Sequence, residues 1–211
     1  MNGLIKIIRI LLSMLGEKYL KYFNYIYIII SKNTKNLIFK KPYLIVFLIS
    51  LSFSNVNAQK ASLYDVARNG SLFELKELVN NDTDIINKTS KEGYSALTLA
   101  CYYGNNDVAA YLIQNVKDIN SKSGYGTPLM AATVKKNSYL VKLLLENNAN
   151  PNLTDQNNST ALHFAVIFSQ QEIITLLMEY KANPSIKDNR GNTALDYAKI
   201  TNNNNIIQLL K

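Results

Sequence analysis

A short apolar motif recurs along residues 61–211 with a spacing of 32 or 33 positions. In each full copy, a hydroxyl-bearing residue is followed by Leu two positions on and by Ala five positions on, and a large aliphatic residue comes twelve positions after that Ala. The recurring alanines are Ala67, Ala100, Ala132, Ala165 and Ala198. A period of this size predicts a solenoid, in which neighbouring copies bury each other's apolar faces.

Each copy has the apolar spacing of two short helices joined by a polar turn. In the third copy, Thr127 is suited to cap a helix, because its hydroxyl can accept a hydrogen bond from a free backbone N–H. Pro128 follows at the first helical position, where its missing N–H does no harm. Leu140 and Leu144 then share one face of a second helix. The pattern predicts helix pairs at 62–68 and 72–80, 96–103 and 106–115, 128–135 and 138–147, 161–168 and 171–179, and 194–200 and 204–210.

Four copies match one another in register, at 95–100, 127–132, 160–165 and 193–198. They resemble the ankyrin repeat, whose signature is Thr-Pro-Leu-His-x-Ala within about 33 residues. The resemblance implies an all-α solenoid of stacked helix-turn-helix hairpins with short β-hairpin-like loops. It also implies that His163, the only histidine, bonds backbone groups between repeats. The first and last copies depart from the signature, as capping repeats do. The implied repeats lie near 61–89, 90–121, 122–154, 155–187 and 188–211.

Residues 36–58 have the three parts of a secretory signal peptide: a positive flank, an apolar run at 43–53 and a short polar end. The apolar run is shorter than the roughly 20 residues that a spanning helix needs. We therefore predict cleavage after Ala58, which leaves a periplasmic or secreted repeat domain at 59–211. The alternative is a protein anchored in the membrane through an uncleaved N-terminus.

Residues 1–35 precede this segment, although a signal peptide ordinarily begins near the N-terminus. Two interpretations remain open. Either the start codon is assigned too early and translation begins near residue 35, or residues 1–35 are a membrane-associated extension. Sequencing of the precursor separates them, because only the second predicts a chain that begins at Met1.

Charge is divided unevenly between the two parts of the chain. Residues 1–58 hold eight of the 23 Lys and Arg residues but only one of the 15 Asp and Glu residues. Residues 59–211 hold the other 15 basic and 14 acidic residues. The repeat domain is thus close to neutral, and we expect no nucleic-acid partner, because cationic contacts dominate such binding. The single cysteine, Cys101, has no intrachain disulfide partner and is expected to be a buried apolar residue.

The sequence predicts no catalytic residue, no cofactor and no metal site. The positions equivalent to His163 hold Thr98, Met130 and Asp196, so the repeats do not produce a row of ligands. A P-loop, a nucleophile elbow and an HExxH motif are also missing from the sequence. We therefore expect a non-catalytic protein.

Ankyrin-like arrays usually bind their ligands with the loop tips and the exposed face of each first helix. Carried over by position, the resemblance gives ten partner-binding candidates: Lys91, Glu92, Tyr94, Tyr102, Tyr103, Tyr125, Lys135, Asn158, Phe168 and Arg190. Four of them are Tyr, which is favoured at binding surfaces, although Tyr102 and Phe168 have the alternative of packing between neighbouring first helices.

We expect a monomer that binds another protein in the bacterial cell envelope, with the membrane met only transiently, through the signal segment. Two finer hypotheses remain open. The protein is an inhibitor, immunity or protective partner of an exported enzyme or toxin, or it is a secreted host-directed effector. Cell fractionation and neighbouring genes separate these hypotheses.

Overall fold

The computed structural model describes residues 61–211. The extension at 1–35 and the signal segment at 36–58 therefore lie outside the described residues. Within 61–211 the chain forms five helix pairs and one 3-10 turn, η1 (Ile85–Asn87). The pairs are α4 (Leu63–Asn69) with α5 (Leu72–Asn81), α6 (Ala96–Tyr103) with α7 (Asn106–Asn115), α8 (Pro128–Val134) with α9 (Ser138–Glu146), α10 (Ala161–Ile167) with α11 (Gln171–Glu179), and α12 (Ala194–Ile200) with α13 (Asn204–Leu209).

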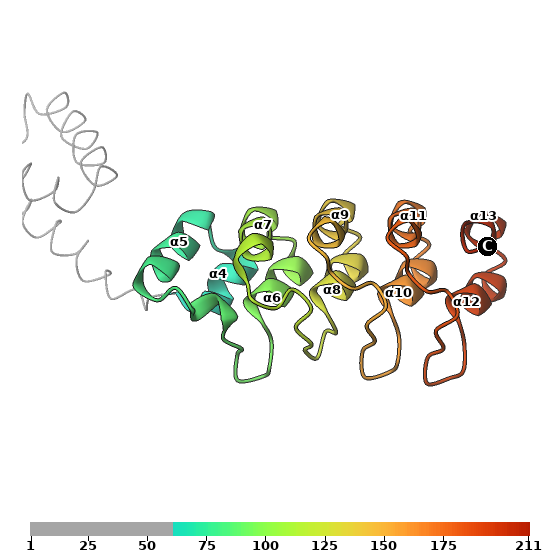
Figure 1. Cartoon of the computed structure of the whole chain (residues 1–211), viewed down its shortest axis with the longest axis horizontal. Coiled ribbons are helices and arrows are strands. Elements are labelled where there is room, and N and C mark those ends of the chain that lie inside the picture. Colours follow the sequence, from blue (N-terminus) through green and yellow to red (C-terminus); the bar gives the residue numbers. More distant parts are fainter. Residues whose placement is uncertain (1–60) are drawn as a thin grey trace, which may run out of the picture. The chain divides into compact units, whose positions relative to one another are not determined.

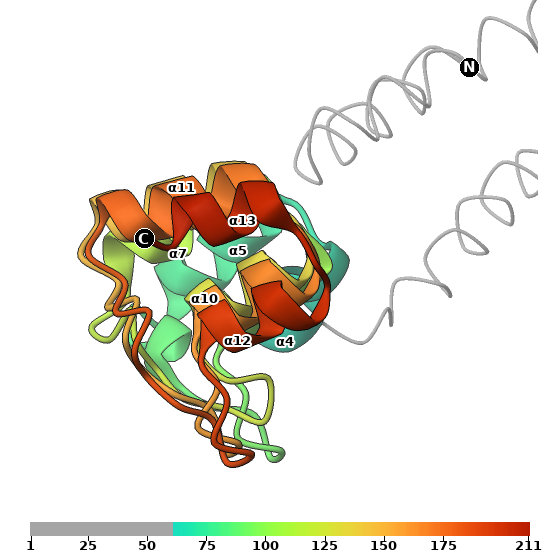
Figure 2. The same ribbon diagram turned by 90° about the vertical axis from the view of Figure 1, so that its right-hand side faces the viewer.

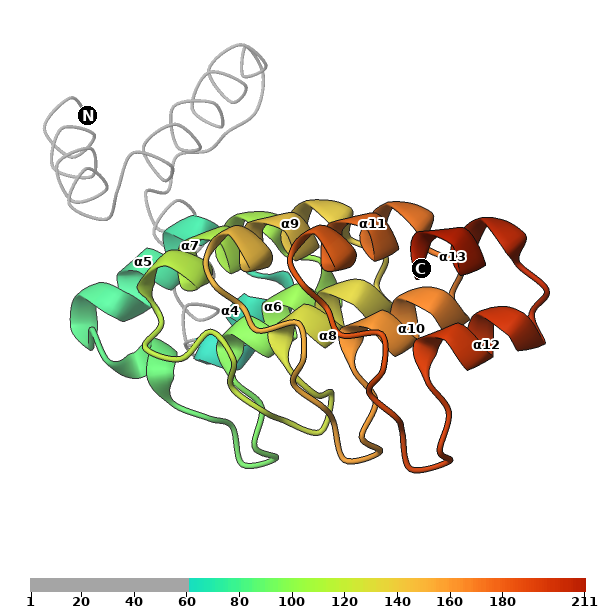
Figure 3. The same ribbon diagram turned by 45° about the vertical axis from the view of Figure 1, so that its right-hand side comes forward.

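The helices stand in two parallel rows (Figures 1 and 2). One row holds the first helix of each pair, from α4 to α12, and the other holds the second helices, from α5 to α13. Each helix contacts the neighbouring helices of its own row, and the loops between pairs project beyond the first-helix row (Figure 3). The prediction of an all-α solenoid is confirmed. None of the described helices is long and apolar enough to cross a membrane.

The observed helix bounds lie within one residue of the predicted ones. Ser62 is an N-cap with extended backbone rather than the first residue of a helix. Four helices end one residue early, because Lys135, Asn147, Phe168 and Leu210 serve as C-caps. Isolated antiparallel bridges join Thr89 to Ser95 and Ser123 to Gly126 in the described loops, where hairpin strands were expected.

The hydroxyl residues of the motif cap the first helices, as predicted for Thr127 and its equivalents. The Thr127 hydroxyl accepts a hydrogen bond from the Met130 N–H at 3.3 Å. In the last copy, Thr193 and Asp196 form a reciprocal capping box, in which each side chain accepts a hydrogen bond from the other residue's backbone N–H. These bonds satisfy backbone donors that a helix start otherwise leaves free.

The recurring alanines lie at the closest approach of the stacked helices. Ala67, Ala100, Ala132, Ala165 and Ala198 are all fully buried. A larger side chain at any of these positions would overlap the neighbouring helices, because protein cores are packed without spare volume. The aliphatic residues of the second helices complete the same core. Of these, Leu112, Leu144 and Leu177 have no exposed surface.

Four loop tips are closed by backbone hydrogen bonds, and one tip is shorter than the others. The first tip is 90–94, the second 123–126, the third 155–159 and the fourth 188–192, and in each the first residue's N–H donates to the last residue's carbonyl. The second tip has four residues where the others have five. This deletion accounts for the spacing of 32 between Ala100 and Ala132. The missing residue is therefore taken from the loop and not from the helices of the third pair.

Candidate partner-binding surface

Four tyrosines from three separate segments meet beside the first-helix row, and together with Lys135 we call them the tyrosine surface. The ring of Tyr125 is stacked between two others: its centroid lies 4.6 Å from that of Tyr94 and 4.3 Å from that of Tyr102. Tyr103 meets the edge of Tyr102, with centroids 5.4 Å apart. Five of the ten candidates predicted from sequence therefore lie together.

The short second tip is what brings Tyr125 into this stack. Ser123 and Gly126 exchange two backbone hydrogen bonds of 2.9 Å, so that only Gly124 and Tyr125 form the turn. Gly126 is buried with φ of +76°, a conformation that glycine adopts at little cost. Gly124 lets the neighbouring tip approach, because a Cβ atom there would lie 3.0 Å from the Tyr94 hydroxyl.

The tyrosine surface is partly accessible. Tyr103 is 47% exposed and Tyr125 is 37% exposed, whereas Tyr94 and Tyr102 are half-buried and pack against the core. The packing alternative for Tyr102 is thus correct in part. Burial raises the pKa of the Tyr125 phenol, and Tyr94, Tyr103 and Tyr102 raise it further, because an ionised neighbour would repel a second phenolate.

Two cations border the rings. The Lys135 ammonium lies 5.0 Å from the ring centroid of Tyr102, and the Arg68 guanidinium lies 5.9 Å from that of Tyr103. Such contacts stabilise a cation over an aromatic face. Sequence reasoning missed Arg68, which lies in the degenerate first copy. Its position in the repeat gives no signal, because the residue equivalent to Arg68 in the next copy is the buried Cys101, directly after the recurring Ala100.

The candidates on the first tip, Lys91 and Glu92, are exposed next to this surface. A hydrogen bond from Ser90 holds the pKa of the Glu92 carboxyl below its usual range, and the charges of Arg68 and Lys91 lower it further. The first tip is therefore linked electrostatically to the Arg68 edge of the tyrosine surface.

Of the three predicted candidates outside the first two tips and the tyrosine surface, Asn158 and Arg190 lie on the third and fourth tips, and Phe168 follows α10 as its C-cap. The Asn158 amide donates to the Asn189 side chain at 2.6 Å, which joins the third tip to the fourth. Arg190 is exposed, and its backbone N–H donates to Asp188. Phe168 is 40% exposed and lines a separate hollow.

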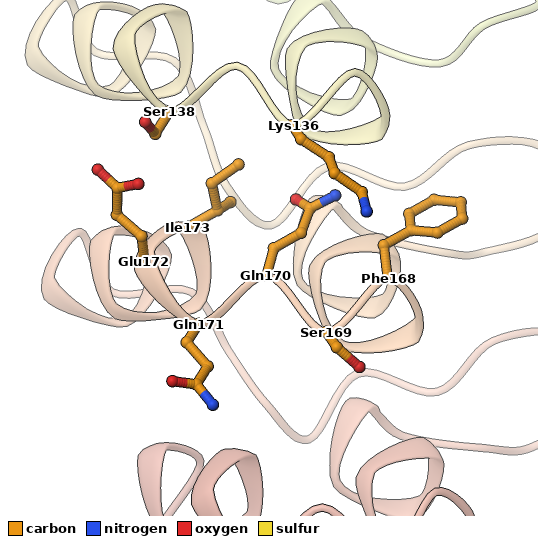
Figure 4. Close-up of a pocket in the computed structure, with 8 residues that line it drawn as sticks. All are labelled: Lys136, Ser138, Phe168, Ser169, Gln170, Gln171, Glu172 and Ile173. Atoms are coloured by element: carbon orange, nitrogen blue, oxygen red, sulfur yellow. The ribbon is translucent and has the colours of Figure 1, made fainter.

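That hollow, of about 230 Å³, lies at the junction of the third and fourth helix pairs (Figure 4). Lys136, Phe168 and Gln170 line it, and the start of α11 forms one wall. The Gln170 amide nitrogen donates to the Thr133 carbonyl at 2.9 Å, while its buried oxygen has no hydrogen-bond partner among the described residues. The equivalent Asn137 instead caps the helix that follows it.

His163 has the structural role that the resemblance implied. It is 1% exposed, and its Nδ1 accepts a hydrogen bond from the Thr160 N–H at 3.1 Å. Because Nδ1 accepts, Nε2 carries the proton and donates to the Asn192 carbonyl of the fourth tip at 3.2 Å. The ring therefore ties two neighbouring copies together.

The described residues contain no group of three or more His, Cys, Asp and Glu side chains arranged to hold a metal ion. Cys101 is fully buried, and burial strongly raises the pKa of its thiol. A thiol in this state has little thiolate and is unreactive. Its expected place as a buried apolar residue is confirmed.

Comparison with known proteins identifies the repeat. A family model for ankyrin repeats (three copies) matches residues 40–123, 63–155 and 129–211. The first of these matches begins inside the predicted signal segment.

Three relatives share part of the chain. BCL-6 corepressor-like protein 1 of Homo sapiens is 33% identical over 112 residues, which are 53% of this chain and 6% of that protein. Ankyrin repeat and KH domain-containing protein 1 of Homo sapiens is 40% identical over 77 residues, which are 36% of this chain and 3% of that protein. An ankyrin repeat-containing protein of Treponema pallidum (strain Nichols) is 32% identical over 94 residues, 44% of this chain and 32% of that protein. The chain thus spans a third or less of the length of each relative.

Proposed function

The chain belongs to the ankyrin-repeat family, and we propose that it is an exported, non-catalytic module that binds one protein partner through its tyrosine surface. Members of this family generally serve as scaffolds for protein–protein interaction, so binding of a protein follows from membership. The compartment, the surface and the single partner are the proposed parts.

One observation supports the choice of surface: a rigid stack of three rings with an exposed fourth ring at its edge. Tyr125 is fixed between two neighbours, so little side-chain entropy remains to be lost when a partner binds. Tyr103 offers a large apolar ring and a hydroxyl at 47% exposure. Rigid, amphipathic aromatic residues of this kind are the usual anchors of protein interfaces.

The test of this surface uses a partner captured by cross-linking the full chain in its native compartment. Tyr103→Ala should weaken binding of that partner by about fivefold or more, equivalent to ~1 kcal/mol. Tyr139→Ala is the matched control, because Tyr139 is also exposed, at 55%, but lies on α9 in the second-helix row. Equal affinity of the Tyr103 variant and the wild type would refute the assignment of this surface.

Export is supported by the signal-like pattern at 36–58. N-terminal sequencing of the protein from its native host should give a chain that starts at Gln59, and fractionation should place it in the periplasm or the medium. A chain that is recovered from membranes with residues 36–58 intact would instead support the anchored alternative. Recovery of an intact chain from the cytoplasm would refute export.

A further inference from the structure

The near-neutral repeat domain has a strong internal separation of charge. We define the tip side as the first helices with the loop tips that precede them and the turns that follow them, and the outer side as the second helices with the turns that follow. The tip side holds nine Lys and Arg against five Asp and Glu, whereas the outer side holds five against nine. The tip side is residues 61–71, 85–105, 121–137, 154–170 and 187–203, and the outer side is residues 72–84, 106–120, 138–153, 171–186 and 204–211.

Four of the five acidic groups of the tip side make contacts that hold the fold, and the fifth, Glu92, is hydrogen-bonded to Ser90 on the first tip. Asp155 accepts hydrogen bonds from two backbone N–H groups of its own tip, and Asp188 does the same in the fourth tip. Asp196 caps α12, and Asp65 caps α4 while it also pairs with Arg68. These carboxylates are therefore committed to holding the fold.

Most cations of the same side are not neutralised in this way. Within residues 61–211, six of the nine have no carboxylate oxygen within 4.0 Å: Lys91, Lys122, Lys135, Lys136, Lys187 and Arg190. Arg68 pairs with Asp65 at 3.4 Å, but this pair is exposed, and exposed pairs contribute little and exchange readily. The tip side thus presents a net positive charge, and Lys135 and Arg68 bring part of it to the edge of the rings.

We propose that the occupant of the tyrosine surface is an acidic polypeptide segment. Its carboxylates lie beside Lys135 and Arg68, and its apolar side chains cover the exposed part of Tyr103. The charge on both sides of the contact is then complementary, which favours this partner and repels a basic one. This inference rests on the proposed function, since it names the chemistry of the partner that the tyrosine surface holds.

The ring geometry favours a polypeptide over a nucleic acid. A single-stranded nucleic acid binds by laying its bases on open aromatic faces. Here both faces of Tyr125 are covered by the rings of Tyr94 and Tyr102, and the Arg68 guanidinium lies over Tyr103. What the surface leaves open is the exposed part of Tyr103 and Tyr125 and the bordering cations, and these suit short apolar side chains and carboxylates.

The test measures binding of the full chain to three designed peptides and one oligonucleotide. The peptides are twelve residues long and repeat Glu-Glu-Phe-Pro, Gln-Gln-Phe-Pro or Lys-Lys-Phe-Pro, and the oligonucleotide is twelve thymidylates. At low salt the Glu peptide should bind about tenfold or more tightly than the Gln peptide. The advantage should shrink as salt is raised, because screening weakens exposed charge pairs.

Matched charge reversals locate the effect. Lys135→Glu should weaken binding of the Glu peptide about tenfold. Lys142→Glu, on α9 of the outer side, should change the affinity for this peptide by less than about twofold. Any attraction to the basic residues 1–58 is the same in both variants, so the difference between them reports the tyrosine surface.

Three outcomes would overturn the inference: equal binding of the Glu and Gln peptides, no difference between the two reversals, or tighter binding of the oligonucleotide. If the Glu and Gln peptides bind the wild type equally and Tyr103→Ala abolishes binding of both, the tyrosine surface is confirmed as the binding site and its preference for acidic segments is refuted. If no peptide binds, the acidic partner is refuted, while loss of the captured native partner in Tyr103→Ala would still support the proposed function.

Discussion

The two halves of the array join their loop tips by different chemistry. In the N-terminal half, the first and second tips meet through the stacked rings of Tyr94 and Tyr125. In the C-terminal half, the third and fourth tips meet through amides: the Asn189 backbone donates to the Asn157 carbonyl at 2.9 Å, and the Asn158 and Asn189 side chains bond at 2.6 Å. The helices beneath both halves are stacked in the same way.

The two kinds of connection leave different groups accessible to a partner. Where the tips are joined by amides, their hydrogen-bond donors and acceptors bond to each other, so few of these groups remain to bind a partner. Where the tips are joined by rings, both faces of Tyr125 are covered, but part of Tyr103 and Tyr125 is exposed beside the two cations. The proposed partner site therefore lies in the N-terminal half, where the second tip is one residue shorter than the others.

The largest effect is expected at the short tip, where the two halves differ in backbone. Gly126→Ala should lower the free energy of unfolding by ~2–4 kcal/mol, because a Cβ atom would lie 2.4 Å from the buried Met130 sulfur and φ is +76°. Gly191→Ala, in the fourth tip, should cost only ~1–2 kcal/mol, since φ is +79° but no atom lies within 4 Å. Urea unfolding measures both. Equal losses would mean that the short tip is not tightly packed.

A smaller effect is expected from cutting each connection between tips. Tyr125→Ala removes two stacked pairs and should lower the free energy of unfolding by ~1–3 kcal/mol. Asn189→Ala removes exposed side-chain hydrogen bonds and should cost ~0.5–1 kcal/mol. Chemical denaturation of the two variants tests the order. A larger loss for the Asn189 variant would reverse the comparison between ring and amide connections.

The smallest effect is the ionisation of Tyr125. Its pKa is raised above the usual ~10, so the neutral phenol is favoured in the folded state. The stability from this preference is complete below pH ~10 and is lost as pH rises through the folded pKa. Tyr94→Phe should lower the pKa of Tyr125, because it removes one neighbouring phenolate. Nuclear magnetic resonance titration of labelled tyrosine rings, assigned with Tyr125→Phe, measures both values, and a pKa at or below 10 would contradict the stacked arrangement.

The sequence predicted the fold because every copy carries the same signals. Hydroxyl caps such as Thr127, recurring alanines such as Ala132 and leucines at helical spacing are local features that repeat, and repetition separates them from chance. Stacking then follows, since each helix pair is too small to bury its apolar face alone.

The site was predicted only in part, because position within a repeat does not reveal contacts between repeats. Tyr94, Tyr102 and Tyr125 were named as separate candidates, but their stacking depends on a tip that is one residue short. Asn158 was named by the same rule, yet its side chain bonds to the next tip. The excess of basic residues on the tip side was not visible in the net charge of the repeat domain, which is near zero.

Gln170 gives the array a weak joint. Asn137 and Asn203 reach the N–H of the helix that each precedes. Gln170 instead reaches back to Thr133, and the equivalent Asn105 reaches back to Val66 and Gly70, so that α11 and α7 begin without a side-chain cap. The first amides of α11 should therefore exchange with solvent deuterium sooner than those of α9. Thermal opening would therefore begin at the uncapped starts of α7 and α11, while the capped starts of α9 and α13 would stay closed longer.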